Sequence, residues 1–298
     1  MLAHCELELE VLARRCHNQP VPIIGIGIPI PVIGPAIGDQ VLVVCSTGGK
    51  GLGLDLEGVR MGNNSNWWKV AKQDVRILSN LRGVQQPKQE RSQKSFDEII
   101  LAAKDLMYEH GLEGATVKGV LEKSGVSASS FYGKFDGRDS LLEYMACLFW
   151  LAAEREWGLV LDSRRWRKGG TKPLVEQLMK MLVMWFRAEE TVLRAFLLHA
   201  LAGADGTNLK RISEFDNWLA DEITGLLIER KEEIGHTAPG LAIRVATLQA
   251  VATVRSRLLF LGKNTEDGIS DRRLSQEMSR GFLGHLNIVQ KGSTASLR

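Results

Sequence analysis

The chain has 298 residues, 44% of them hydrophobic and 24% charged, which is typical of a globular protein and excludes a collagen-like, fibrous or wholly disordered chain. Its 38 lysines and arginines nearly balance 35 aspartates and glutamates, so attraction to nucleic acid or to a membrane must come from local placement of charge. The length predicts two structural units, and the irregular spacing of Cys5, Cys16, Cys45 and Cys147 excludes a disulfide framework and favours a reducing cytoplasm.

The first segment is rich in proline. Five of the eight prolines lie between residues 20 and 35, within or beside the uncharged stretch 21–38. Proline at this density removes amide donors and clashes with a helical backbone, so a membrane-spanning helix would leave carbonyl groups unpaired in lipid. We therefore expect an extended apolar arm and no membrane anchor.

Residues 39–81 alternate short β-branched runs with turns rich in glycine and asparagine, which is the pattern of short strands. One interpretation is a small SH3-like β-barrel, in which Trp67 and Trp68 would face opposite sides of a strand. The other is that residues 1–81 are an added extension, with Met61 as an alternative start. Both interpretations stay open, and neither assigns this segment a function.

The motifs that would indicate an enzyme or a metal protein are incomplete. Residues 48–51 contain Gly-Gly-Lys-Gly without the spacing of a phosphate-binding loop, and Gly25-Ile26-Gly27 lacks the third glycine of a dinucleotide fingerprint. Cys16-His17 does not match a common zinc spacing, and the six histidines form no His-Glu-x-x-His pair. We predict a protein that is not an enzyme, with no metal and no cofactor.

After a polar linker at 82–95 the apolar residues take a helical period. Ser95, followed by Glu98, predicts a capping box at the start of this helix, and Gly111 is placed to end it. The residues of its buried face are Phe96, Ile99, Ile100, Ala103, Leu106 and Met107. Three basic residues form an arm before the helix, which we expect to reach a neighbouring DNA groove: Lys88, Arg91 and Lys94.

Two short helices are predicted next, joined by a tight turn. Thr116 is the expected cap of a helix over 117–123, residues 124–126 form the turn, and Ser127 is the expected cap of a helix over 128–132. A helix, a tight turn with glycine and a second short helix are the plan of a helix-turn-helix DNA reader. The second of these helices offers small hydroxyl groups and a tyrosine, and Lys134 and Arg138 follow it as donors for phosphate.

Residues 96–142 resemble the DNA-binding domain of the TetR family of bacterial transcriptional regulators. The matching positions are Gly111, Thr116-Val117, Ser124-Gly125-Val126-Ser127, Tyr132-Gly133-Lys134-Phe135 and Arg138. Lys134 stands where the family often has histidine, and Arg138 where it usually has lysine. Gly119 and Leu121 depart from the family pattern in the helix over 117–123. The DNA-binding residues that the resemblance and the helix pattern imply are Thr116, Lys118, Ser127, Ala128, Ser129, Ser130, Tyr132, Lys134 and Arg138.

The resemblance extends over about residues 90–290 and implies a mainly α fold. Residues 1–87 would be the extension, with or without a β-barrel; 88–142 would be the helix-turn-helix domain; and 143–298 would be a helical domain for ligand binding and dimerisation. The implied function is a cytoplasmic, homodimeric, sequence-specific regulator, a repressor released from a palindromic operator by a small-molecule effector. The alternative is a helical small-molecule-binding or scaffold protein with a non-functional DNA-binding domain.

The helical domain itself shows helical periodicity over 141–160, 173–188, 189–202, 209–234, 239–261 and 270–286. An apolar stripe that could form a dimer seam consists of Leu241, Val245, Leu248, Val251, Ala252 and Leu259. A pocket for an apolar or aromatic effector would be lined by Trp150, Trp157, Met181, Met184, Trp185 and His199. Large aromatic residues and methionine also form ordinary cores, and the sequence leaves both interpretations of this set open.

Overall fold

The computed structural model describes residues 32–33, 43–44, 67–69, 75–78, 80–87, 89–167, 169–203, 207–257 and 268–288. The chain divides into two compact units, of which the first comprises Met1–Lys50 and Asp55–Val59 and the second comprises Gly51–Leu54 and Arg60–Arg298. In the first unit, strand β1 (Val32–Ile33) pairs antiparallel with strand β2 (Val43–Val44). Nearly all of the predicted apolar arm lies outside the described residues.

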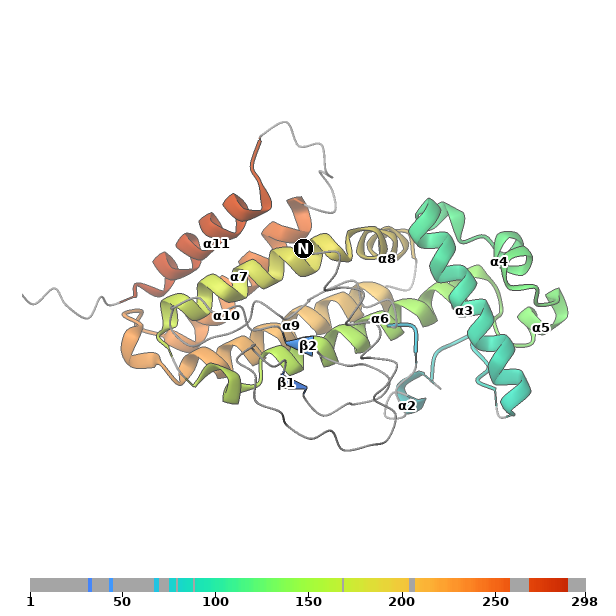
Figure 1. Ribbon diagram of the computed structural model, residues 1–298, viewed down its shortest axis with the longest axis horizontal. Helices are drawn as coiled ribbons and strands as arrows, with labels where there is room; N and C mark the ends of the chain where they lie inside the picture. Colours follow the sequence, from blue (N-terminus) through green and yellow to red (C-terminus); the bar gives the residue numbers. More distant parts are fainter. Residues whose placement is uncertain are drawn as a thin grey trace, which may run out of the picture. The chain divides into compact units, whose positions relative to one another are not determined.

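The first described helix of the second unit is not predicted by the sequence, and the helices after it follow the predicted order. They are α2 (Val75–Leu78), α3 (Glu90–His110), α4 (Val117–Ser124), α5 (Ala128–Tyr132), α6 (Arg138–Val160), α7 (Thr171–Ala188), α8 (Glu190–Ala202), α9 (Thr207–Ile228), α10 (Pro239–Arg255) and α11 (Asp271–Leu286). Figure 1 shows α3, α4 and α5 gathered at one end of this unit and α7, α10 and α11 at the other. Among the described residues, no helix combines the length and apolarity that a bilayer crossing requires.

The β-barrel interpretation of residues 39–81 is unsupported. In the described part of that range, β2 pairs with β1 alone, and Val75–Leu78 forms a helix instead of a strand. Leu78 is fully buried in the second unit, where α2 contacts α6. A single helical turn places this leucine in the core, and its tertiary contacts override the strand propensity of the sequence around it.

Residues 67–87 belong to the second unit, whereas the sequence predicts a domain boundary at residue 87. Trp67 is only 2% exposed. Val84 forms an antiparallel bridge with Phe135, flanked by hydrogen bonds from Gln85 N to Lys134 O at 2.8 Å and from Asp136 N to Gly83 O at 2.9 Å. This segment is therefore bonded along the turn that follows α5. The boundary predicted at residue 142 falls inside α6, which is continuous from Arg138 to Val160.

Helix α3 begins earlier than the sequence predicts. Its N-cap is Gln89 without a side-chain cap bond, and Ser95 lies inside the helix, where its hydroxyl donates to Ser92 O at 3.1 Å. The predicted capping box is therefore wrong. Good helix formers in the linker and i,i+4 pairs such as Lys94 with Glu98 favour the earlier start. The predicted basic arm is thereby part of a helix at Arg91 and Lys94, and Lys88 lies outside the described residues.

Helices α9 and α10 also differ from prediction in detail. Helix α9 ends at Ile228 because the chain then forms a short 3₁₀ turn and Ile234 makes a β-bridge with Ile288. The predicted seam on α10 divides into two groups. Val251 is 1% exposed and packs in the core, whereas Leu241 is 62% exposed. The outward stripe consists of Leu241, Val245, Leu248 and Ala252, at helical spacing, and Leu259 lies outside the described residues.

Candidate nucleic-acid interface

The helix-turn-helix is held by the local bonds that the sequence predicts. Thr116 caps α4, its Oγ1 accepting from Gly119 N at 3.0 Å, and Ser127 caps α5, its Oγ accepting from Ser130 N at 3.3 Å. Gly125 ends α4 with a φ of 69°, a conformation that favours glycine. The predicted caps and the predicted turn are confirmed.

An aromatic cluster beneath the turn fixes α5 on α3 and α6. The Phe135 ring lies 4.9 Å from Phe96, 5.7 Å from Phe131 and 6.0 Å from Tyr144, measured between centroids. All four residues are at most 1% exposed. Because α5 has only five residues, this packing determines its orientation and thereby the direction in which its polar residues point.

The exposed side of α4 and α5 carries most of the predicted DNA-binding residues. Tyr132 is 55% exposed, and the Lys118 side chain is 87% exposed and lies 3.9 Å from Glu122. We call the exposed predicted residues the reader face: Thr116, Lys118, Ser127, Ala128, Ser129 and Tyr132. This face therefore combines hydroxyl groups, a methyl group and one lysine on a rigid support.

Lys134 does not point outward as the sequence suggests. The residue is 7% exposed, and its ammonium donates to Ser130 O at 3.1 Å and to Ser130 Oγ at 2.9 Å. These bonds lie at the carboxyl end of α5, where a cation also interacts favourably with the helix carbonyls. Both Lys134 and the Ser130 hydroxyl are thus engaged within the domain.

Arg138 also bonds internally. Its Nε donates to Ala115 O at 2.8 Å, and its Nη2 donates to Leu112 O at 2.6 Å. The first residue of α6 thereby binds the loop that leads into α4. A guanidinium with two carbonyl acceptors fixes both segments, because its planar fork holds both acceptors in one geometry. In this arrangement Arg138 positions the reader face without being part of it.

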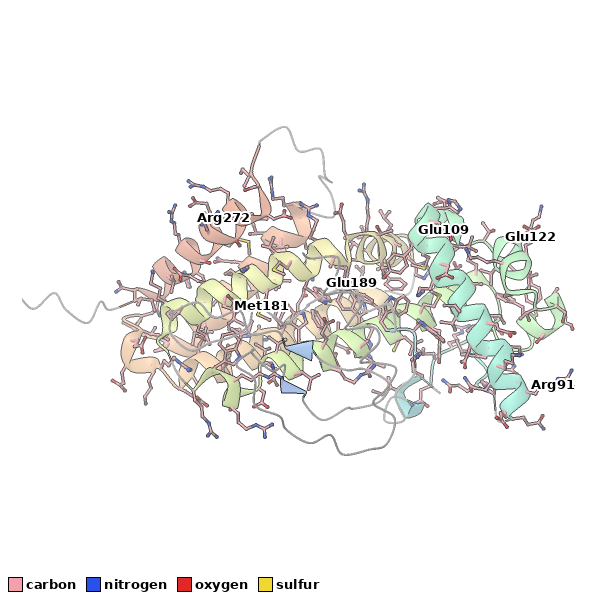
Figure 2. The ribbon with its side chains drawn as sticks, viewed as in Figure 1. Arg91, Glu109, Glu122, Met181, Glu189 and Arg272 are labelled. Carbon is pink, nitrogen blue, oxygen red and sulfur yellow. The ribbon has the colours of Figure 1, made fainter. Side chains whose placement is uncertain are left out.

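The surrounding charges are mixed. Lys123 donates to Glu109 at 2.6 Å, and this ion pair holds the pKa of Glu109 below its usual range. Figure 2 shows Arg91 at the opposite end of α3 from Glu109. Arg91 and Lys94 are both exposed on the first turns of that helix. The basic groups near the reader face are therefore few and dispersed.

The predicted ligand-binding residues of the helical domain are only partly brought together. Trp150, Trp157, Met181 and Trp185 are buried, His199 is half-buried, and Met184 is 42% exposed. A cavity of about 10 Å³ lies among the aromatic residues, and Trp185 is the one predicted residue in its lining. Its full lining is Trp67, Phe149, Ala152, Ala153, Glu156, Trp185 and Glu189.

Sequence reasoning missed most of this lining. Glu156 lies in the charged run Glu154-Arg155-Glu156 and Glu189 is followed by Glu190, so no local signal in the sequence distinguishes these two glutamates from surface charges. A larger groove of about 690 Å³ runs between α7 and α11, but polar and charged residues such as Lys172, Lys180 and Arg272 line it. Among the residues that the structure describes, no cluster of three or more His, Cys, Asp or Glu residues could hold a metal ion.

Comparison with known proteins gives a family for the helix-turn-helix segment. Residues 99–145 match the model of "Bacterial regulatory proteins, tetR family". A protein of Mesorhizobium loti assigned to the TetR family of transcriptional regulators matches the fold with a TM-score of 0.51 at 17% identity, over 66% of this chain and 98% of that chain. Among curated proteins, none matches this chain.

Two further structures have lower scores. Salmonella enterica GusR has a TM-score of 0.46 at 13% identity, over 67% of this chain and 98% of that chain. A member of the TetR transcriptional regulator family from Streptomyces coelicolor A3 has a TM-score of 0.40 at 23% identity, over 63% and 90% of the two chains. With its capped helices, its glycine turn and its family match, the segment 99–145 is a helix-turn-helix domain of the tetR family of bacterial regulatory proteins.

Proposed function

We propose that this chain is a sequence-specific transcriptional regulator, a cytoplasmic repressor that binds a palindromic operator as a homodimer and is released by a small-molecule effector. The observation that carries the proposal is the reader face, which presents six exposed residues on helices fixed by caps and by an aromatic core. Such a surface fits the major groove, where donors and acceptors of the base edges are accessible to a short helix.

Within this proposal the residues divide into three roles. Lys118 and Tyr132 would contact phosphates, because both side chains are exposed and carry a hydrogen-bond donor at their ends. Ser129, in the first turn of α5, would meet base edges. Lys134 and Arg138, which bond to Ser130 and to the loop before α4, would position the other residues.

Replacing Lys118 with alanine is expected to weaken specific and non-specific DNA binding alike. Each phosphate contact releases counterions, so the slope of log affinity against log salt should flatten by about 0.9 for each half-site. Fluorescence anisotropy at several salt concentrations measures this slope. Lys180→Ala, which removes an exposed lysine of α7, is the matched control and should leave the slope unchanged. Equal slopes for both variants and the wild type would refute the phosphate role.

Replacing Ser129 with alanine should instead change which operator variants bind best. A good base contact contributes about 1–3 kcal/mol of discrimination, so the ranking of sequences should alter at one position of each half-site. Tyr132→Phe removes one hydroxyl and should lower all affinities while keeping the ranking. Affinities for a panel of operator variants distinguish the two effects. If Tyr132→Phe changes the ranking of operator variants and Ser129→Ala only lowers all affinities, Tyr132 contacts the bases and Ser129 contacts phosphate.

Effector control is supported by the course of helix α6. This single helix begins at Arg138, whose guanidinium holds the loop before α4, and continues past Phe149 and Glu156, which line the cavity of the helical domain. A ligand that shifts α6 would therefore change the spacing of the two reader faces in a dimer. Such a shift weakens operator binding to the extent that the ligand prefers the shifted state.

The alternative function is a small-molecule-binding or scaffold protein whose DNA-binding domain is non-functional. The inward placement of Lys134 and Arg138 favours it, since the family motif assigns both positions to phosphate contacts. This alternative predicts weak binding that disappears as salt is raised and has no preferred sequence. The proposed function predicts that Lys118 and Ser129 have the separate effects described above.

A further inference from the structure

Residues 83–85, which we call the bridging segment, run antiparallel to the turn that joins α5 to α6. At one end of this pairing, Gln85 N donates to Lys134 O at 2.8 Å. At the other end, Asp136 N donates to Gly83 O at 2.9 Å. A segment that precedes α3 therefore holds the backbone of the turn on both sides of its central residue.

The bridging segment approaches the turn closely at Gly83. This glycine has a φ of 72°, a conformation that residues with a β-carbon rarely adopt. A β-carbon at this position would lie 2.9 Å from Asp136 Oδ2 and 3.1 Å from Ser140 Cβ. The chain therefore uses glycine at the point where the segment contacts both the turn and the first helical turn of α6.

The chain before the bridging segment is anchored in the core of the second unit. Leu78 is fully buried where α2 contacts α6. Trp67 meets Phe149 of α6 edge-on at 5.6 Å and Phe196 of α8 edge-on at 5.9 Å. These anchors make the bridging segment a fixed support for the turn, because the segment cannot follow a displacement of the turn without disturbing packed side chains.

Helix α5 depends on support from outside because it has only five residues. Its Phe131 ring packs 5.7 Å from the Phe135 ring, and the Lys134 ammonium donates to Ser130 O at its carboxyl end. The two bonds of the bridging segment are made by Lys134 and Asp136, the neighbours of Phe135. They therefore fix the residue on which α5 packs, and their loss would allow α5 to shift.

We propose that the bridging segment is a positioning element of the reader face, and that discrimination between DNA sequences depends on its two backbone bonds. The inference rests on the proposed function and gives a role in it to residues that precede the family match at 99–145.

A small shift of α5 would affect base contacts more than phosphate contacts. The proposed contacts of Ser129 with base edges need a fixed geometry, because a hydrogen bond weakens steeply when it is misaligned. The attraction between Lys118 and phosphate depends mainly on distance and carries no sequence information. Loss of the bridging bonds should therefore weaken specific binding more than non-specific binding.

The test replaces Gln85 with proline, which has no N–H to donate to Lys134 O. Fluorescence anisotropy of the full chain with a DNA fragment selected by the wild type, and with a scrambled fragment, gives the ratio of specific to non-specific affinity. Gln85→Pro should lower this ratio at least about tenfold. The Gln85 side chain is exposed, so Gln85→Ala, which keeps the N–H, is the matched control and should retain the wild-type ratio.

A second control separates positioning from a general loss of stability. Leu182→Ala opens a cavity at a buried leucine of α7 and leaves the bridging segment intact. It lowers the folded fraction, which reduces both affinities by the same factor and keeps their ratio. A ratio lowered equally by Leu182→Ala would overturn the inference. If Gln85→Pro does not fold, Gly83→Ala disturbs the same contact through its β-carbon and should also lower the ratio.

Hydrogen exchange in the absence of DNA, followed by NMR, tests the support of the turn independently of any operator. The Asp136 amide should exchange at least about tenfold faster in Gln85→Pro than in Gln85→Ala, because the neighbouring bond that holds the segment is lost. The Val120 amide, which donates to Thr116 O within α4, should exchange at the same rate in both proteins.

The outcomes separate this inference from the proposed function. An unchanged affinity ratio for the folded Gln85→Pro and Gly83→Ala proteins would overturn the inference even if the wild type binds a specific operator. If the wild type prefers no DNA sequence, the proposed function fails and exchange at Asp136 decides the inference. Faster exchange confined to the variant without the N–H would then support positioning of the turn by the bridging segment, and equal exchange would overturn it.

Discussion

Deleting residues 1–87 is expected to lower the free energy of unfolding by at least about 4 kcal/mol, whereas deleting residues 1–59 should change it by less than about 1 kcal/mol. The longer deletion removes Trp67 and Leu78 from the core, together with the bridge between Val84 and Phe135. Loss of a single buried tryptophan or phenylalanine costs about 3–5 kcal/mol, and the longer deletion removes more than one such contact.

Urea denaturation of the two truncated proteins and of the full chain measures this difference, with gel filtration as a check for aggregation. The shorter deletion is the control, because it removes the first compact unit and, from the second unit, only Gly51–Leu54. Equal stability of both truncated proteins would contradict the assignment of residues 67–87 to the second unit.

Replacing Leu248 with glutamate is expected to produce monomers and to reduce operator affinity by at least about a hundredfold, or about 2.7 kcal/mol. Leu248 lies in the outward stripe of α10, and in a two-fold interface each introduced charge would meet the partner's copy of the same apolar patch. A monomer would bind one half-site instead of two and would lose the contribution of the second reader face.

Sedimentation velocity at micromolar concentration measures the oligomeric state. Leu159→Glu is a matched control, since Leu159 is a 53% exposed leucine near the end of α6, outside the stripe. This variant should behave as the wild type. A Leu248→Glu protein that stays dimeric would exclude the α10 stripe as the seam. Val251 cannot serve in this test, because its side chain is 1% exposed and a charge there would disrupt the core.

The sequence predicts the helix-turn-helix of α4 and α5 well, because the interactions that determine it are local. Thr116 and Ser127 cap their helices through bonds to amides three residues away, and Gly125 supplies the turn, so each feature depends on a short stretch of chain. The capping box at Ser95 fails because several good helix formers before it extend α3. Local signals of this kind compete, and the longer helical stretch prevails.

Long-range contacts determine the features that the sequence does not predict. The acceptors of Arg138 lie 23 and 26 residues earlier, at Ala115 and Leu112, and no local pattern indicates that its guanidinium turns inward. Trp67 bonds to Tyr108, which follows 41 residues later, and a short run of aromatic and β-branched residues around it imitates a strand. The cavity lining was missed for the same reason, since Trp67, Phe149 and Glu189 come from separate parts of the chain.

Selection of DNA by the full chain from a randomised pool tests the central claim most directly. If the chain is a homodimeric, sequence-specific regulator, selection at about 150 mM salt should enrich an inverted repeat with half-site centres about one helical turn apart, or slightly more. The Ser129→Ala protein should enrich a different base at one position of each half-site. Recovery of no common sequence, with binding only at low salt, would contradict the claim that this reader face recognises an operator.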